Sequence, residues 1–290
     1  MADITYWHSV RGEEHIMDIP FVKLQGNGND FILIDETDGI IIPDDMKGEF
    51  AALYCDRRFG IGADGVLFIS RSTAANIKMR LFQPDSSEAE MCGNGIRCLS
   101  KYAYDMNYVE NKCSVETLSG ILDVEMSYNS DDEFTAKIDM GKIIFDRPAI
   151  PASGAGDYIE EISGFTVYAV NTGVPHAVIF TQSIESLNIC EIAPEIRHHK
   201  TFPHGANVNF VQVSGEDEIT IRTFERGVED ETFSCGTGST ASAAIAHKTG
   251  KTGDKVLVHT RGGPLTIFIS EGSASMQGPA VTVFSGIISQ

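Results

Sequence analysis

A five-residue pattern occurs twice in the sequence, and this repeat limits the possible folds more than any other property of the chain. The two copies are Met91-Cys92-Gly93-Asn94-Gly95 and Ser234-Cys235-Gly236-Thr237-Gly238. Their cysteines lie 143 residues apart, close to half of the 290-residue chain. Self-similarity at such a spacing is typical of an internal duplication. We therefore predict two similar domains, each of which contributes one copy.

The segments before the two copies have the same pattern of side chains. Apolar and polar residues alternate over residues 77–81 and again over residues 219–223, which is the period of a half-buried strand. An acidic segment follows each strand, at residues 85–88 and at residues 229–232, and supplies candidate helix-start residues. Each copy is therefore expected to lie at a junction between a strand and a helix.

The residues after each copy predict a helix. Residues 239–248 are almost all small and end before the glycine stop at Gly250. After the first copy, apolar residues recur at helical spacing and polar residues fill the positions between them. The apolar positions are Ile96, Leu99, Ala103 and Met106, and the polar ones are Arg97, Lys101 and Asp105.

Elsewhere, strand patterns dominate the sequence, and glycine and proline clusters separate them. We predict an α+β fold of two pseudo-symmetric domains, each a mixed β-sheet or barrel wrapped around one central helix. The N-terminal half, residues 1–140 with residues 279–290, carries Cys92, and the C-terminal half, residues 141–278, carries Cys235. The active site is expected in the cleft between them. The strands are expected at residues 66–70, 167–170, 176–180, 208–213, 256–260, 265–269 and 281–284.

The charge of the chain argues against two classes of partner. It has 41 acidic and 22 basic residues, a net charge of −19, which repels nucleic acids and anionic membrane surfaces. No apolar run approaches the ~18 residues of a membrane span. Residues 1–19 lack the basic and apolar regions of a signal peptide. We expect a cytoplasmic protein that binds neither nucleic acid nor membranes.

The cysteines indicate chemistry at the repeated pattern. The six cysteines are too sparse for a disulfide scaffold and lack the Cys-x-x-Cys spacing of a zinc site, so no metal is expected. A helix N-terminus presents free N–H groups to a carboxylate and favours the thiolate form of a cysteine. If the two junctions face each other, one thiolate removes an α-proton and the opposite thiol reprotonates the other face. This predicts an amino-acid epimerase that needs no cofactor, with Cys92 and Cys235 as its catalytic residues.

Nearly end to end, the sequence resembles the diaminopimelate epimerases, lysine-biosynthesis enzymes that interconvert LL- and meso-2,6-diaminoheptanedioate. Seven segments carry the resemblance, and together they are highly specific. They are residues 26–31, 56–65, 87–98, 173–176, 207–210, 225–227 and 235–238.

The resemblance implies an isomerase without cofactor or metal, acting on a small amino-acid substrate, and it favours a homodimer. Gln83 stands where an Asn usually contacts substrate, and Val174 replaces the Asn of a Gly-Asn-Pro-His segment. Gln83 keeps an amide and is retained as a substrate contact. The resemblance gives Cys92 and Cys235 as the acid/base pair, backbone amides at Gly93, Asn94, Gly236 and Thr237 for the reacting carboxylate, and Asn29, Asn207, Glu225 and Arg226 for the amino group and distal end.

Two other functions stay open at this point. Proline racemases and hydroxyproline epimerases share the two-thiol logic, but they usually carry His where Asn94 stands and Asp-Arg-Ser-Pro where residues 231–234 are Glu-Thr-Phe-Ser. A thiol redox or ligand-binding protein would instead join Cys92 and Cys235 in a regulatory disulfide. The glycines of residues 60–65 fit a dinucleotide fingerprint, yet a strand pattern follows them instead of a helix. His198 and His199 are expected at the surface, without a metal.

Overall fold

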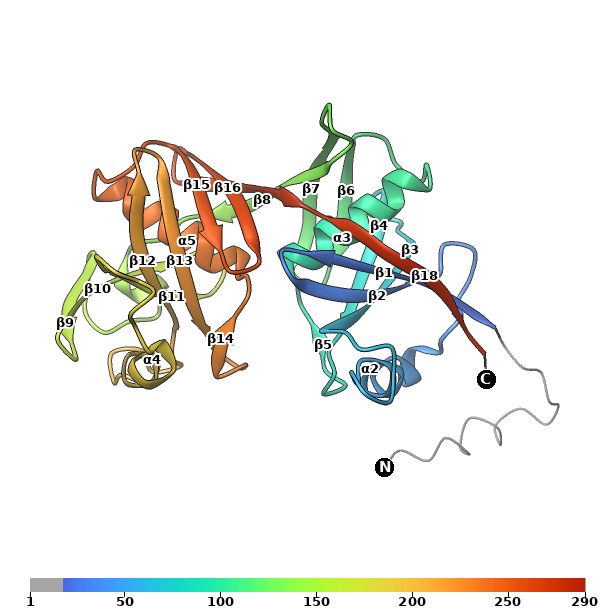
Figure 1. The fold of residues 1–290 in the computed structure, drawn as a ribbon, viewed down its shortest axis with the longest axis horizontal. Helices are drawn as coiled ribbons and strands as arrows, with labels where there is room; N and C mark the ends of the chain where they lie inside the picture. The colour runs from blue at the N-terminus through green and yellow to red at the C-terminus, as the bar shows by residue number, and fades with distance from the viewer. Residues whose placement is uncertain (1–17, 290) are drawn as a thin grey trace. The chain divides into compact units, whose positions relative to one another are not determined.

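A computed structural model describes residues 18–289, which form two compact units (Figure 1). Unit 1 comprises residues 30–122 together with the chain up to Gln25 and from Val281, and unit 2 comprises residues 26–29 and 123–280. The chain passes from unit 1 to unit 2 inside strand β7 (Gly120–Tyr128), whereas the sequence predicted the end of the N-terminal half at residue 140. Most of the segment examined for a signal peptide lies outside the described residues. None of the helices in residues 18–289 has the length and apolar character needed to cross a bilayer.

Unit 1 is a mixed sheet with a helix on each side. Strand β18 pairs antiparallel with β1, β2 runs parallel to β3, β3 pairs antiparallel with β4, and β4 runs parallel to β6. Helix α3 packs against β3, β4 and β18. The elements are β1 (Ile19–Gly26), β2 (Asn29–Asp35), η1 (Asp44–Met46), α2 (Lys47–Tyr54), β3 (Gly65–Arg71), β4 (Ile77–Phe82), β5 (Glu88–Ala89), α3 (Gly93–Asp105), β6 (Lys112–Thr117) and β18 (Val281–Ile288).

Unit 2 is a longer mixed sheet that curves around helix α5. Its pairings run from β9 through β10, β11, β12, β13, β15, β16, β17 and β8 to β7. Helix α5 contacts β10 to β13 and β15 to β17, so it is the central helix of this unit. The elements are β8 (Phe134–Lys142), η2 (Arg147–Ala149), β9 (Tyr158–Ile162), β10 (Phe165–Asn171), β11 (Pro175–Phe180), α4 (Ile189–Arg197), β12 (Asn207–Gly215), β13 (Glu218–Glu225), β14 (Asp230–Thr232), α5 (Gly236–Lys248), β15 (Lys255–Thr260), β16 (Gly263–Ser270) and β17 (Ser273–Pro279).

The two units contain the same succession of elements. In unit 1 the chain runs β2, α2, β3, β4, β5, α3, β6, and in unit 2 it runs β11, α4, β12, β13, β14, α5, β15. The pairings match as well: the first two strands are parallel, the next two form an antiparallel hairpin, and the last strand runs parallel to the second strand of that hairpin. The expectation of a two-domain α+β fold with a central helix in each domain is therefore confirmed.

The helices begin later than the acidic segments suggested. Cys92 and Cys235 are themselves the N-cap residues of α3 and α5. The acidic segments instead supply the short strands β5 and β14, because their glutamates are held by arginines on the neighbouring strand. Arg80 on β4 binds both oxygens of Glu88 at 2.7 and 3.0 Å, and Arg222 on β13 binds both oxygens of Glu231 at 2.7 Å each.

The amphipathic pattern predicted for α3 holds at three of its four apolar positions. Ile96, Leu99 and Ala103 are fully buried, as expected. Met106 follows the helix and is 48% exposed. Arg97, one of the polar positions between the apolar ones, is 0% exposed. It tolerates burial because its guanidinium bonds polar groups of its own helix, as described below.

The glycine-rich segment of residues 60–65 leads into strand β3, as its sequence indicated. Gly62 adopts φ +79°, a left-handed conformation that glycine reaches without a steric penalty. The backbone of this segment bonds α2 through the N–H groups of Ile61 and Gly62, both of which donate to the carbonyl of Tyr54. The segment therefore joins α2 to the sheet and is no dinucleotide loop.

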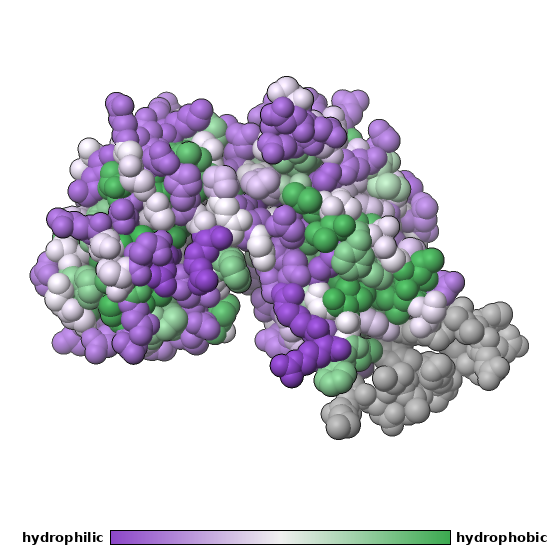
Figure 2. Space-filling model, in the orientation of Figure 1, coloured by the Kyte–Doolittle hydropathy of each residue, from purple (hydrophilic) through white to green (hydrophobic). Residues whose placement is uncertain are grey.

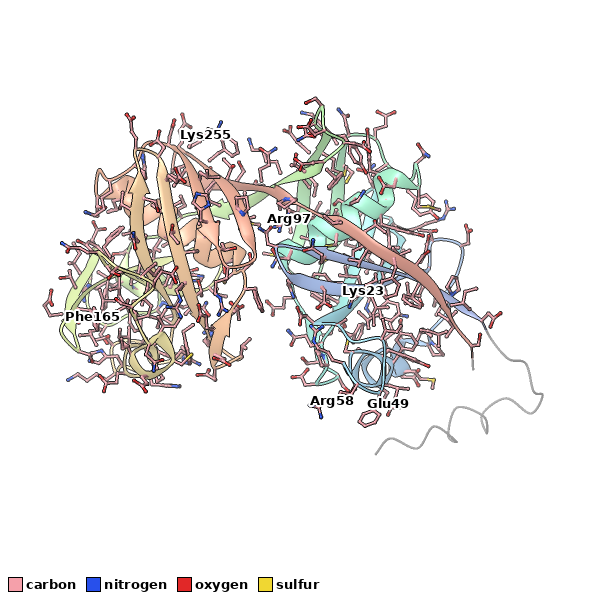
Figure 3. All side chains as sticks on the ribbon, in the orientation of Figure 1. Lys23, Glu49, Arg58, Arg97, Phe165 and Lys255 are labelled. Carbon is pink, nitrogen blue, oxygen red and sulfur yellow. The ribbon has the colours of Figure 1, made fainter. Side chains whose placement is uncertain are left out.

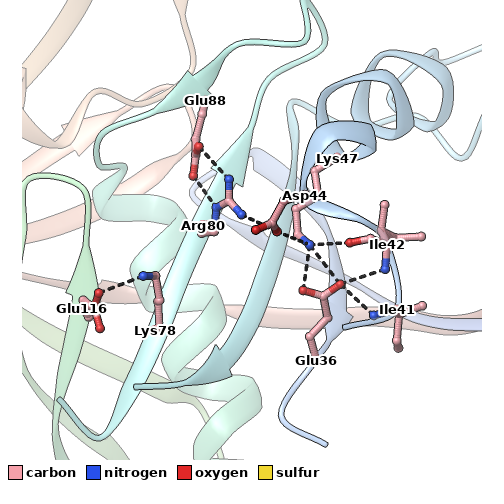
Figure 4. Close-up of polar contacts among 9 residues, drawn as sticks. All are labelled: Glu36, Ile41, Ile42, Asp44, Lys47, Lys78, Arg80, Glu88 and Glu116. Carbon is pink, nitrogen blue, oxygen red and sulfur yellow. Dashed lines mark hydrogen bonds and ion pairs between the residues drawn. The ribbon is translucent and has the colours of Figure 1, made fainter. Parts of the chain in front are cut away.

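A buried ion pair fixes α2 to the sheet of unit 1. Figure 4 shows Lys47 at the start of α2 between Glu36, Asp44 and the carbonyl of Ile42. Its Nζ lies 3.0 Å from the Glu36 carboxylate, and the two side chains are only 1% and 5% exposed. Glu36 also accepts hydrogen bonds from the N–H groups of Ile41 and Ile42. The pair thereby holds the loop between β2 and α2 in place.

Removing one partner of this pair will destabilise the chain strongly. We expect Lys47→Met to lower the free energy of unfolding by about 3 kcal/mol, because it leaves the Glu36 carboxylate buried without its cation. The matched control is Lys78→Met, since Lys78 and Glu116 form a pair with side chains 36% and 27% exposed. That change should cost less than about 1 kcal/mol. Urea unfolding followed by circular dichroism measures both, and equal losses would contradict the assignment.

Candidate active site

Cys92 lies at the end of the short link between β5 and α3. Its backbone is extended, with φ −145° and ψ 116°, and its carbonyl accepts the first helical bond from the N–H of Ile96 at 2.9 Å. The Sγ atom accepts a hydrogen bond from the N–H of Gly95 at 3.5 Å. The thiol is partly exposed. Sequence and structure therefore agree that this sulfur lies among the amides of a helix N-terminus.

Cys235 occupies the same position in unit 2. Its backbone is extended, with φ −122° and ψ 110°, and its carbonyl accepts the N–H of Ser239 at 2.8 Å. The Sγ lies 3.4 Å from the Oγ1 of Thr237, and the residue is 7% exposed. The carbonyl of Thr237 is in turn held by the hydroxyl of Thr172 at 2.9 Å. Both cysteines are thus N-caps with their sulfurs beside the first helical turn.

The third residue after each cysteine is a glycine that packs closely against the sheet. A Cβ atom at Gly95 would lie 3.3 Å from Leu67 Cδ2 and 3.5 Å from the Cβ of Cys92. A Cβ at Gly238 would lie 2.4 Å from Asn209 Oδ1, which is closer than real atoms approach. Glycine therefore lets each helix begin directly against the sheet, with its first-turn amides available to a ligand.

Beneath the first turn of α3 lies the guanidinium of Arg97. Its Nη2 donates to the Oδ1 of Asn94 at 2.9 Å, and its Nη1 donates to the carbonyl of Gly93 at 3.4 Å. Figure 3 labels Arg97 at this end of α3. Burial lowers the pKa of the guanidinium to about 10, while the Coulomb interactions with Cys98 and Cys92 oppose that shift. The sequence reading missed its role, although an arginine one turn after the cysteine was a visible signal.

Beneath the first turn of α5 lies an uncharged polar network. Asn209 on β12 donates through Nδ2 to the Nδ1 of His176 at 3.0 Å and accepts through Oδ1 from the hydroxyl of Thr223 at 2.9 Å. Burial lowers the pKa of His176 to about 3, so the imidazole is neutral at neutral pH. His176 therefore serves this network as a structural hydrogen-bonding partner. Asn209 was missed, although it shares a strand face with Asn207.

Two of the candidate distal residues are joined directly in unit 2. The Oδ1 of Asn207 accepts the backbone N–H of Arg226 at 2.7 Å. Glu225, the last residue of β13, has its pKa raised by burial, an effect that the neighbouring Thr232 partly offsets. The turn after Arg226 is held by Glu229, which accepts the N–H of Gly227 at 3.0 Å and pairs with the buried Arg197 at 2.8 Å. Arg226 therefore begins a rigid turn.

The segment with Asn29 belongs to unit 2, although β2 continues into unit 1. Gly28 lies against Phe233, two residues before Cys235, with a Cβ position 3.4 Å from the Phe233 Cβ. Asp30 follows Asn29 at once, and burial by itself would raise the pKa of its carboxyl. Hydrogen bonds and charges from Arg57 and Lys23 outweigh burial and lower the pKa of Asp30 to about 2. An ionised anchor thus fixes the chain directly after Asn29.

The two positions that depart from the family pattern differ in their surroundings. Gln83 is exposed at the end of β4, where its Oε1 accepts the hydroxyl of Ser87 at 3.0 Å. Val174 is partly buried in the turn between β10 and β11, and its carbonyl accepts the N–H of Thr172 at 3.3 Å. Gln83 therefore keeps an amide N–H₂ for a ligand, whereas Val174 contributes only apolar surface.

Each unit by itself gathers part of the predicted residues. Unit 1 holds Gln83 directly after β4 and Cys92, Gly93 and Asn94 at the start of α3, and unit 2 holds Asn29, Asn207, Glu225, Arg226, Cys235, Gly236 and Thr237. Two hollows of about 550 Å³ lie elsewhere, one beside residues 104–111 and one beside residues 244–248 and 269–272.

Within residues 18–289, no three His, Cys, Asp or Glu side chains cluster as metal ligands. His198 is exposed and pairs with Glu229.

The fold is that of several two-domain α+β proteins of known structure. A phenazine biosynthesis protein of the PhzF family from Bacillus anthracis superimposes with a TM-score of 0.69 at 16% identity, over 94% of this chain and 99% of that one. A hydroxyproline epimerase from Agrobacterium vitis, solved with trans-4-OH-L-proline, superimposes with a TM-score of 0.64 at 16% identity, over 94% of this chain and 92% of that one. These likenesses define the class by its architecture.

Sequence comparison identifies the family within this class. The family model for diaminopimelate epimerase matches residues 21–145 and 168–283. The diaminopimelate epimerase of Methanothrix thermoacetophila is 54% identical over 272 residues, which cover 93% of this chain and 96% of that protein. That of Archaeoglobus fulgidus is 49% identical over 275 residues, covering 94% and 97%. The chain belongs to the diaminopimelate epimerase family, and it is an isomerase. The resemblance seen in the sequence is confirmed.

Proposed function

We propose that this protein interconverts LL- and meso-2,6-diaminoheptanedioate and that Cys92 and Cys235 carry out the proton transfers. Membership in the family supports the reaction and its place in lysine biosynthesis. The observation that carries the assignment of residues is the repeated construction: in each unit a cysteine caps a helix and is followed, three residues later, by a glycine packed closely against the sheet. The proposed site lies in a cleft where both helix N-termini meet one α-carbon.

In the proposed mechanism the reaction uses the protein's own groups. One thiolate takes the α-proton and becomes a thiol, and the electron pair of the broken C–H bond moves into the substrate carboxylate. The opposite thiol then gives its proton to the other face of the α-carbon and becomes a thiolate. First-turn amides at Gly93, Asn94, Gly236 and Thr237 hold the carboxylate and stabilise its added charge. This account requires neither pyridoxal phosphate nor a metal.

The remaining predicted residues are proposed to select a long diamino diacid. Arg226 can bind the distal carboxylate through two parallel hydrogen bonds, and its turn is held by Asn207 and Glu229. Asn29, Gln83, Asn207 and Glu225 offer amide and carboxylate groups for the amino groups. A proline substrate has no second carboxylate, so an arginine in this place favours the diaminopimelate reaction over proline or hydroxyproline epimerisation.

We also propose that the protein works as a homodimer in the cytoplasm, where thiols stay reduced. The exposed apolar side chains of β18 support the dimer. Val281, Val283, Phe284 and Ile287 are 46–63% exposed, and Figure 2 shows apolar side chains gathered over this strand. Residues 281–288 carry no charge in a chain whose net charge is −19, so a second copy can approach this strand without repulsion.

The proposed dimer can be tested at β18. Sedimentation should show a species of twice the 31.5 kDa chain mass. Phe284→Glu should shift it toward the monomer, because it places a charge among the exposed apolar side chains, whereas Leu257→Glu changes an exposed apolar residue of unit 2 and should not. A monomeric unsubstituted chain, or a dimer that Phe284→Glu leaves intact, would contradict the proposed interface.

Each proposed catalytic thiol should be necessary. With diaminopimelate in D₂O, the reduced protein should exchange the α-proton for deuterium and interconvert the isomers. Cys92→Ala and Cys235→Ala should each lower epimerisation by about 10²- to 10⁴-fold, because each removes the acid/base group of one face. Cys190→Ala, which removes an exposed thiol on α4, is the matched control and should retain the wild-type rate.

The same assay separates the redox alternative. Reversible oxidation should silence an epimerase, since neither sulfur of a disulfide can accept or donate a proton. A redox carrier would instead turn over with a thiol partner. Absence of deuterium uptake by the reduced protein, or full activity of either alanine variant, would contradict the proposed function.

The proposed distal contact makes a separate prediction. Arg226→Lys keeps the charge but loses the two-point grip on a carboxylate. We expect KM for diaminopimelate to rise roughly tenfold, the equivalent of about one charge-assisted hydrogen bond. Arg71→Lys, at an arginine whose side chain is 79% exposed in unit 1, is the control. Steady-state kinetics of both variants decide, and an unchanged KM for Arg226→Lys would rule out the contact.

A further inference from the structure

The two half-sites are alike in backbone but differ in charge. Five residues after Cys92 stands Arg97, and five residues after Cys235 stands Thr240. Both side chains are buried under the first turn of their helix. Thr240 donates its hydroxyl to the carbonyl of Gly236 at 3.0 Å, and Arg97 bonds the carbonyl of Gly93 at 3.4 Å. The same place in the repeat is therefore filled by a neutral group in unit 2 and by a cation in unit 1.

Arg97 keeps its charge in the neutral range. Its pKa falls to about 10 on burial, which still lies well above neutral pH. The thiols whose charges interact with it are those of Cys98 and Cys92. Burial raises the pKa of the Cys98 thiol to about 12, so Cys98 stays protonated. Cys92 is therefore the group whose ionisation the buried cation can favour.

The other charged groups on the strands that pack against α3 are engaged elsewhere. On β4, Lys78 and Arg80 alternate with the apolar residues that face α3, and they pair with glutamates on β6 and β5. On β2, Asp35 accepts the hydroxyls of Tyr102 and Tyr108 near the far end of α3. On α3 itself, Lys101 pairs with Asp105 at 2.7 Å. Strand β18 has no charged residue, and Arg71 on β3 pairs with Asp38. The charge of Asp30 on β2 contributes to the raised pKa of Cys98.

Near the α5 N-terminus the charge of Arg226 acts on His176, but Arg226 is only partly buried and its guanidinium bonds the carbonyl of His204 at 3.4 Å, whereas Arg97 is 0% exposed. Asn209 and Thr223 are neutral, and His176 is held neutral by burial, with a pKa of about 3. The nearby acid, Glu225 on β13, has its pKa raised by burial, and its ionised form would repel a second anion. The same helix geometry thus meets a fully buried cation in unit 1 and, in unit 2, a partly exposed cation next to the acidic Glu225.

We propose that Arg97 is a positioning residue that makes Cys92 the thiolate of the resting protein and leaves Cys235 as the thiol. The proposal rests on the function proposed above. Arg97 acts in two ways: its charge stabilises the anion, and its bonds to Asn94 and Gly93 orient the first-turn amides. The resting form is then ready for the stereoisomer whose α-proton faces Cys92. After that turnover the proton is on Cys92 and the negative charge is on Cys235, and exchange with solvent restores the resting form.

The test measures the ionisation of each thiol without substrate. Cys190→Ser removes the exposed background thiol, and Cys235→Ser or Cys92→Ser then leaves one site thiol in the full-length chain. Iodoacetamide reacts with the thiolate, so its rate against pH gives a midpoint, and peptide mass spectrometry identifies the modified cysteine. We expect the midpoint of Cys92 to lie below that of Cys235 by about one pH unit.

Variants of Arg97 test the cause of that order. Arg97→Gln keeps a donor for Asn94 but removes the charge, so it should raise the Cys92 midpoint by about one pH unit and leave that of Cys235 unchanged. Arg97→Lys should restore the low midpoint. Lys101→Gln removes a charge from the same helix one turn later and should shift neither. Circular dichroism verifies that each variant folds. If Arg97→Gln does not fold, the proposal is judged by whether Cys92 has a lower midpoint than Cys235 in the single-thiol variants that retain Arg97.

Two results would overturn the proposal: a Cys92 midpoint at or above that of Cys235, or a folded Arg97→Gln variant with an unchanged Cys92 midpoint. The outcome is separable from that of the proposed function. A chain that epimerises diaminopimelate but ionises Cys235 first contradicts this inference alone. A chain that ionises Cys92 first but exchanges no α-proton contradicts the proposed function alone.

Discussion

The close approach of two helix N-termini to their sheets is the contact on which the rest of the structure depends. Each helix can start against the sheet because Gly95 and Gly238 have no side chain: a Cβ would lie 3.3 Å from Leu67 in one case and 2.4 Å from Asn209 in the other. The cysteines before them consequently cap the helices in an extended conformation. Their sulfurs lie beside amides that no helical carbonyl can satisfy. The chemistry of the proposed site follows from this arrangement.

The repeat is conserved in backbone and altered in side chains. Both units hold their short strand by a bidentate arginine–glutamate pair, Arg80 with Glu88 and Arg222 with Glu231. Below the helices the units diverge, since unit 1 buries a guanidinium and unit 2 buries an amide and a neutral imidazole. A reaction that inverts one stereocentre needs two matching acid/base groups, and at any moment one must be charged and the other neutral. A duplicated backbone supplies the two matching groups, and the different side chains buried beneath α3 and α5 make their surroundings unequal.

The sequence predicted the parts of the fold whose signal is local. Strands with alternating apolar residues and the apolar side of α3 appear where their periodicity placed them, and the repeated pattern located both helix starts to within a few residues. Helices α2 and α4 were not anticipated. Helix α4 contains Pro194, and α2 is eight residues long with Lys47 buried by a pair to Glu36, eleven positions away. Such contacts between distant side chains leave no periodic trace.

The candidate site shows the same division. Cys92 and Cys235 could be selected from the sequence because they repeat, but the residues beneath them could not. The sequence marks Arg97 only as a polar position of the helix, and charged side chains in helices are usually exposed. Its burial depends on acceptors at Asn94 and Gly93, which only the three-dimensional arrangement reveals. Asn209 likewise reads as one polar residue in an apolar strand until Thr223 and His176 are seen to bond it.

The central claim, that two thiols act on one carbon, is tested most directly by a crystal structure of the reduced protein with a diaminopimelate analogue bound. The account predicts that both sulfurs lie on opposite faces of the same α-carbon, each at roughly 3–4 Å, with the carboxylate bonded to the first-turn amides of α3 and α5. A ligand that contacts only one of the two helix starts, or sulfurs separated by intervening side chains, would contradict it.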